Sequence, residues 1–96
     1  MTDPLQNAIA EGEQAKQLSE NPYFKKLLEG LDQAYFQAWK TEPDAAKREK
    51  LHGMVCVLDD LRRNIKSAVD RAVQAKHQIA RNEQLAEAEK LPGPRA

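Results

Sequence analysis

The chain has 96 residues, enough for one small domain, and 31% of them are charged while only 5% are aromatic. No stretch alternates apolar and polar residues as a strand does, so this composition indicates an all-α protein rich in surface ion pairs. The net charge of zero excludes a strongly basic or acidic chain, but residues 1–46 carry eight acids and four bases, and residues 47–81 four acids and nine bases. We expect these two segments to neutralise each other in an antiparallel fold.

The first helix is predicted over about residues 4–18. Asp3 is a good N-cap, and Pro4 suits the first helical position because the amide that it lacks would be unpaired there anyway. The apolar face is thin and includes Gly12, so this helix is marginal unless it docks on another one.

The second helix is predicted over about residues 22–40. Asn21 can cap it, and Pro22 disfavours helical geometry in the residue before it, so the chain breaks at Asn21. Phe36 and Trp39 widen its apolar face. The centre of that face is formed by Phe24, Leu27, Leu28, Leu31, Ala34, Tyr35 and Ala38.

The third helix is predicted over about residues 42–89, with Thr41 as its cap and Asp44 three residues later as in a capping box. It would span about 70 Å, whereas the second helix covers only about 28 Å of it. Either the first helix folds back over the remainder, or the Ala-rich half pairs with another subunit. The expected apolar stripe is Leu51, Met54, Leu58, Leu61, Ile65, Ala68, Ala72, Ala75 and Ile79.

These patterns predict a single helical domain over residues 1–91 and a flexible tail over residues 92–96. The predicted fold is an antiparallel helical hairpin with a short N-terminal helix packed along one long C-terminal helix. Such a hairpin has no thick core, so we expect it to be oligomeric. The register counted through the turn is given by four pairs: Leu31 with Met54, Leu27 with Leu58, Phe24 with Leu61, and Gly12 with Ala72.

No catalytic or cofactor motif is present, so we expect neither enzymatic activity nor a cofactor. His52 and His77 would lie about 37 Å apart on one helix and cannot share a metal within one chain. Asp59 and Asp60 are adjacent on a helix and diverge by about 100°, so they cannot converge on one cleft. We expect surface ion pairs instead, of Asp59 with Arg62 or Arg63 and of Asp60 with Arg63.

Three small residues of the helices carry structural expectations. Cys56 lies in an apolar run and is expected to be buried, and as the only cysteine it excludes an intramolecular disulfide. Gly30 and Gly53 each cost a helix about 1 kcal/mol relative to Ala, which favours close packing under a neighbouring group.

The longest apolar run, residues 54–58, supports neither secretion nor membrane insertion.

Protein contacts are the function that the residues favour. The candidate interface residues are Tyr35, Trp39, Val55, Val57 and Val73, because Trp and Tyr are common interface anchors and the valines extend the apolar flank. The bases of the third helix are spread around it without interleaved aromatics, so we do not expect nucleic-acid binding.

Several short motifs fall together in the middle of the chain: Ala34-Tyr35, Ala38-Trp39-Lys40, the Pro43-Asp44 turn, Arg48-Glu49 and Leu51. With them, residues 20–75 resemble a group of small helical proteins of unassigned function encoded in tailed-phage and prophage genomes. The position matching His52 is commonly Trp in that group, so this chain departs there. The resemblance implies a phage context and a non-enzymatic role, and it supplies no site residues.

Taken together, the sequence predicts a phage-encoded virion structural or assembly accessory, in the virion or the host cytoplasm, that contacts itself or a larger phage or host protein. Two alternatives stay open: a small regulator that inhibits a host or phage enzyme, and a nucleic-acid-associated packaging accessory.

Overall fold

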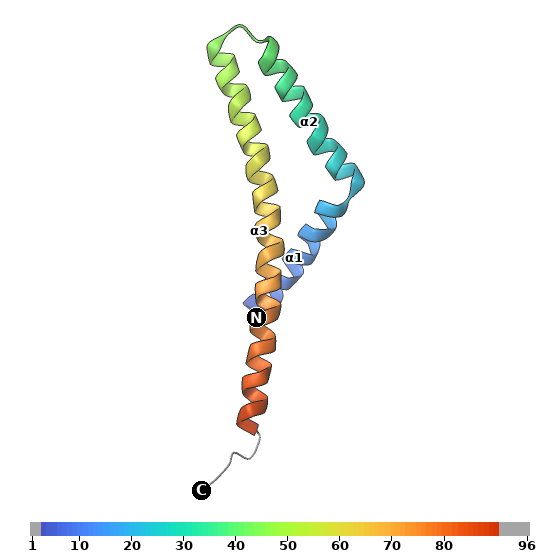
Figure 1. Ribbon diagram of the computed structural model, residues 1–96, viewed down its shortest axis with the longest axis vertical. Coiled ribbons are helices and arrows are strands. Elements are labelled where there is room, and N and C mark those ends of the chain that lie inside the picture. The colour runs from blue at the N-terminus through green and yellow to red at the C-terminus, as the bar shows by residue number, and fades with distance from the viewer. Residues whose placement is uncertain (1–2, 91–96) are drawn as a thin grey trace.

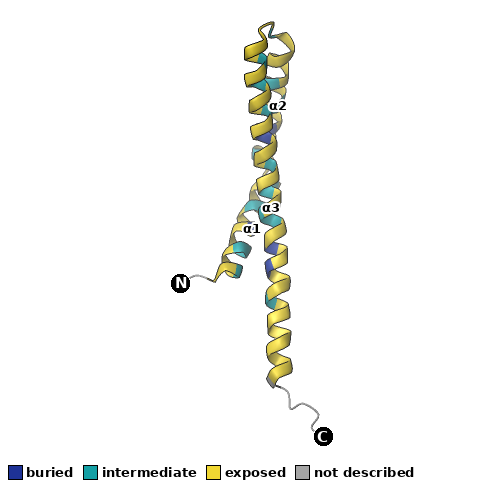
Figure 2. Ribbon diagram, turned by 90° about the vertical axis from the view of Figure 1, so that its left-hand side faces the viewer, coloured by how far each residue is buried: buried dark blue, intermediate teal, exposed yellow. Residues whose placement is uncertain are grey.

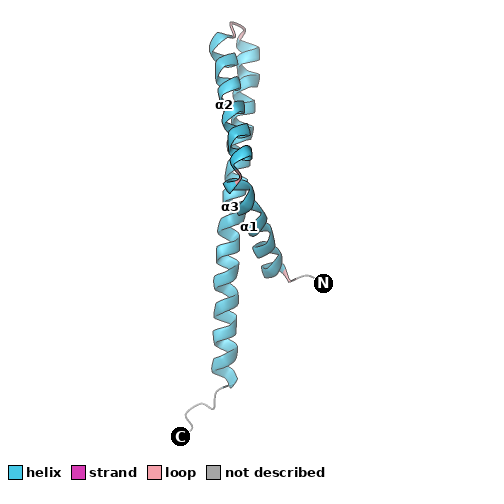
Figure 3. Cartoon of the chain, turned by 90° about the vertical axis from the view of Figure 1, so that its right-hand side faces the viewer, coloured by secondary structure: helices cyan, strands magenta, loops and turns pink. Residues whose placement is uncertain are grey.

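The computed structural model describes residues 3–90, and nearly all of them are helical. The elements are α1 (Pro4–Glu20), α2 (Pro22–Thr41) and α3 (Ala45–Lys90). This part of the chain contains no strand, which confirms the all-α prediction (Figure 3). The flexible tail predicted for residues 92–96 lies outside the described residues.

The first two helices begin where the sequence predicts, because local capping groups fix both starts. The Asp3 carboxylate accepts a hydrogen bond from the Leu5 amide at 3.0 Å. The Asn21 side chain accepts from the amides of Tyr23 and Phe24 at 2.9 and 3.0 Å, and its backbone is extended (φ −69°, ψ 119°). Each cap thus satisfies amides that have no partner within the helix.

The prediction that Thr41 caps the third helix is wrong. The Thr41 hydroxyl donates to the Gln37 carbonyl at 3.0 Å, so Thr41 is the last residue of α2. Asp44 is the cap instead, because its carboxylate accepts from the Lys47 amide at 3.0 Å. Asp is the stronger N-cap of the two, and α3 therefore begins at Ala45 rather than at residue 42.

The helices form a long, thin molecule. From the turn at residues 42–44, α3 runs back past α2 and α1 and then projects beyond them (Figure 1). The principal extents are 81 × 26 × 25 Å and the radius of gyration is 22.0 Å. A compact domain of this length would have a radius of gyration of about 12.5 Å.

Small residues let α1 approach α3 more closely than α2 does. Gly12 is buried, as are Ala72 and Ala75 on α3. A Cβ atom at Gly12 would overlap the Cβ of Ala72 and would lie 2.9 Å from the carbonyl oxygen of Ala68. The close approach of Gly12 and Ala72 agrees with the register expected from the sequence.

Between α2 and α3, the expected register and stripe are wrong in part. Leu28 and Leu58 are buried, but Leu31, Met54, Leu27 and Leu61 are 40%, 45%, 46% and 39% exposed. The apolar arc of α3 is too wide for one neighbouring helix to cover. Most of the molecule is accordingly exposed (Figure 2).

Candidate functional site

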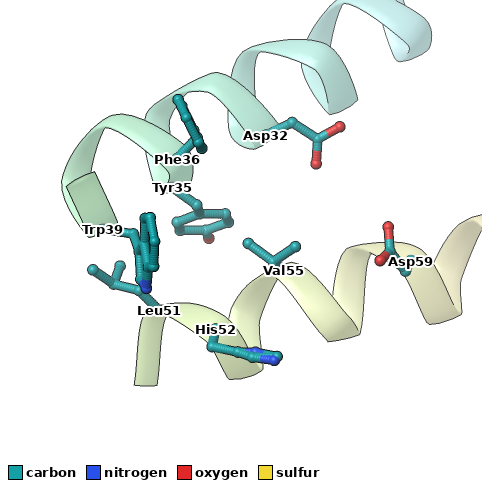
Figure 4. A pocket seen from close by; sticks show the side chains of 8 residues that line it. All are labelled: Asp32, Tyr35, Phe36, Trp39, Leu51, His52, Val55 and Asp59. Atoms are coloured by element: carbon teal, nitrogen blue, oxygen red, sulfur yellow. The ribbon is translucent and has the colours of Figure 1, made fainter. Parts of the chain in front are cut away.

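An open groove of about 600 Å³ lies between the C-terminal half of α2 and the N-terminal half of α3 (Figure 4). We call it the aromatic groove. From α2 its lining residues are Asp32, Tyr35, Phe36 and Trp39, and from α3 they are Leu51, His52, Val55 and Asp59. The spacing of the α2 residues follows the helical repeat, which places them along one side of α2.

The aromatic side chains of the groove are held by one another and by a cation. Phe36 and Trp39 are stacked, with ring centroids 6.4 Å apart and an interplanar angle of 25°. The Arg48 guanidinium lies 4.4 Å from the centroid of the Trp39 ring, which is cation–π geometry. Trp39 remains 40% exposed and Phe36 52% exposed, so a partner can reach both rings.

Arg62 joins α2 to α3 at the end of the aromatic groove where Asp32 and Asp59 lie. Its guanidinium bonds to the Asp32 carboxylate across the two helices and lies 3.5 Å from the Asp59 carboxylate on its own helix. These side chains are about one third to three fifths exposed, so solvent screening limits the cross-helix pair to about 1 kcal/mol or less. Two carboxylates share one guanidinium here, which leaves this end of the groove with a net negative charge.

The predicted local ion pairs are present, whereas the link to Asp32 was not predicted. Arg62 pairs with Asp59, and Arg63 pairs with Asp60 at 2.7 Å. The expected register placed Asp32 opposite Gly53 rather than Arg62. No pattern within one helix can reveal a partner that is 30 positions away.

The structure brings three of the five candidate interface residues together. Tyr35 and Val55 are half-buried in the aromatic groove and Trp39 forms its rim. Val57 is 65% exposed and points away from the groove, because two positions on a helix differ by about 200°. Val73 is 49% exposed on a later part of α3. Sequence reasoning did not single out Phe36 as an interface residue, although its three-residue spacing from Trp39 places both rings on one side of α2.

The expectation that Cys56 is buried is wrong. Cys56 is exposed, and its Sγ lies 3.8 Å from Nε2 of His52, one turn earlier. Leu58 is the buried residue of this run, so Cys56, two positions away, points to the opposite side of α3. In the described part of the chain, no group of three or more His, Cys, Asp or Glu side chains could hold a metal ion.

The expectation of close packing at Gly30 and Gly53 is also wrong. A Cβ atom added at either position would meet nothing within 4 Å. The glycine that permits a close approach is Gly12, and nothing in the structure explains the other two.

The lining of the aromatic groove suits the apolar side chains of another protein. Its walls are aromatic and aliphatic, it is open to solvent, and its charged groups lie at its ends. Among the described residues, no helix has both the length and the apolar composition needed to cross a membrane. The chain matches no known family model, no curated protein and no solved structure.

Proposed function

We propose that the chain is a phage-encoded, non-enzymatic structural or assembly accessory of the virion, built as an antiparallel helical hairpin that self-associates and binds a larger protein. One observation carries the proposal: among the described residues, eleven large hydrophobic side chains are exposed and none is fully buried. Exposed apolar surface on this scale is typical of chains that complete their packing against other proteins. The phage context is supported by the resemblance of residues 20–75.

The aromatic groove is the surface that we assign to the larger partner. Trp and Tyr are enriched among the few residues that carry most of the binding energy at protein interfaces. The two carboxylates at the Arg62 end favour a partner with a basic residue there, while Arg48 at the other end favours an acidic one. An amphipathic helix with apolar side chains between two such charges fits this groove.

Particle composition tests the proposal directly. Mass spectrometry of purified particles of the phage that encodes the chain is expected to detect many copies of it per particle. The double variant Phe36→Ala/Trp39→Ala is expected to be at least about tenfold depleted from particles, since losing two interface aromatics costs several kcal/mol.

The matched control is Val73→Ala, which removes apolar surface of similar exposure outside the groove and is expected to enter particles normally. Absence of the wild-type chain from particles would reject the virion role. Recovery with one host enzyme at equal stoichiometry would instead support the regulator.

A further inference from the structure

A second apolar surface lies on the opposite side of the α2–α3 pair from the aromatic groove. In α2, Asp32 and Phe36 lie on the groove side of the buried Leu28, and Leu27 and Leu31 lie on the other side, as the rotation of about 100° per residue requires. In α3, the same rotation places Met54, Val57 and Leu61 on the side of the buried Leu58 that faces away from the aromatic groove. We call this surface the leucine face, and its residues are Leu27, Leu31, Met54, Val57 and Leu61.

All five side chains of the leucine face are accessible, with exposures between 39% and 65%. Along α2 the face continues through Ala34 and Ala38, so it carries no charged side chain between residues 27 and 38. On α3 it runs from Met54 to Leu61. Asp59 points away from it, and Asp60, three residues after Val57, lies at its border, where it pairs with Arg63. An apolar surface whose one bordering acid is paired with Arg63 meets little like-charge repulsion from its own copy.

Over its whole length, the chain exposes more surface than a compact monomer of its size. The accessible surface is 7957 Å², whereas a compact monomer of 10.8 kDa would expose about 5,500 Å². The excess is more than twice the area of about 800 Å² that each partner contributes to a standard interface. Two antiparallel helix pairs that pack face to face make a four-helix bundle with a shared interior.

We propose that a second copy of the chain packs its leucine face against this one, so that two α2–α3 pairs form a four-helix bundle. The contact is isologous, because the same surface serves both copies. This inference rests on the proposed self-association and names the surface that performs it. It leaves the aromatic groove of each copy free for the larger partner.

Light scattering coupled to size exclusion tests the dimer and its surface together. Wild-type protein is expected at twice the 10.8 kDa chain mass. The double variant Leu31→Glu/Met54→Glu is expected to elute as a monomer, with dimer affinity reduced at least about a hundredfold, since burying unpaired carboxylates is costly. Both side chains are exposed in the single chain, so far-UV circular dichroism is expected to show unchanged helicity.

The matched control is Val73→Glu/Leu85→Glu, which adds the same charge at exposed apolar sites outside both the leucine face and the aromatic groove. It is expected to remain dimeric. A monomeric wild type would overturn both the inference and the proposed self-association. A dimer that survives Leu31→Glu/Met54→Glu would overturn the inference alone, because the chain would then self-associate through another surface.

A distance measurement keeps the inference testable if the glutamate variants do not fold. In a Cys56→Ser background, spin labels at Leu31→Cys are expected to report a shorter inter-chain distance than labels at Phe36→Cys. The reverse order would overturn the assignment of the leucine face.

Discussion

Of the three glycines among the described residues, Gly12 is the one at which an added methyl group would meet a neighbouring helix. In Gly12→Ala, the new Cβ overlaps the Cβ of Ala72 and approaches a backbone oxygen, so α1 must move away from α3. Overpacking of this kind is expected to lower the free energy of unfolding by about 1–3 kcal/mol. Urea denaturation followed by circular dichroism measures the change.

Gly30→Ala is the matched control, because a Cβ at Gly30 meets nothing within 4 Å. It is expected to raise the free energy of unfolding by about 0.5–1 kcal/mol, since Ala loses less conformational entropy in a helix. Equal effects of the two substitutions would contradict the close approach of α1 to α3.

At the same scale, the sequence predicted what depends on neighbours along one helix. The pairs of Asp59 with Arg62 and of Asp60 with Arg63 follow from helical spacing alone. The environments of Cys56 and Gly30 depend on where the neighbouring helix lies, and an apolar run does not give that direction. Both residues were therefore assigned to a packed interior that the structure does not place around them.

At the scale of elements, one ion pair ties α1 to α3. Lys76 Nζ lies 2.8 Å from the Glu13 carboxylate, and the hydrogen bond and charge of Lys76 lower the pKa of Glu13 below its ordinary value of 4.5. A carboxyl group whose pKa is lowered by folding stabilises the folded state above its unfolded pKa. This contribution is lost as the pH falls through the lower, folded pKa.

We therefore expect acid to weaken the docking of α1. Thermal unfolding of the wild type and of Glu13→Gln, measured from neutral pH to below pH 4.5, is expected to show the wild type more stable at neutral pH. The difference should shrink towards zero in acid, because the protonated Glu13 and the glutamine are then equally uncharged. A difference that does not change with pH would contradict the ion pair.

Helix starts and helix pairings differed in how far the sequence could predict them. The caps Asp3 and Asn21 were predicted because a cap bonds to amides two or three residues away. The cap of α3 was predicted wrongly because Thr41 and Asp44 compete for the same role. The α2–α3 register and the stripe were wrong in part, at Met54 and Leu61 among others. Of the aromatic groove, Tyr35, Trp39 and Val55 were predicted as interface candidates, but their meeting in one groove depends on that register.

For the whole molecule, the radius of gyration of a single chain depends on whether α1 packs along its own α3. If it does, the monomeric variant Leu31→Glu/Met54→Glu is expected to have a radius of gyration close to 22 Å, as in the structure. Small-angle X-ray scattering measures this value. Adding Gly12→Ala to the same variant is expected to increase it, because α1 then separates from the Ala-rich half of α3. If instead α1 packs on another chain, the monomeric variant already has the larger radius, and Gly12→Ala leaves it unchanged.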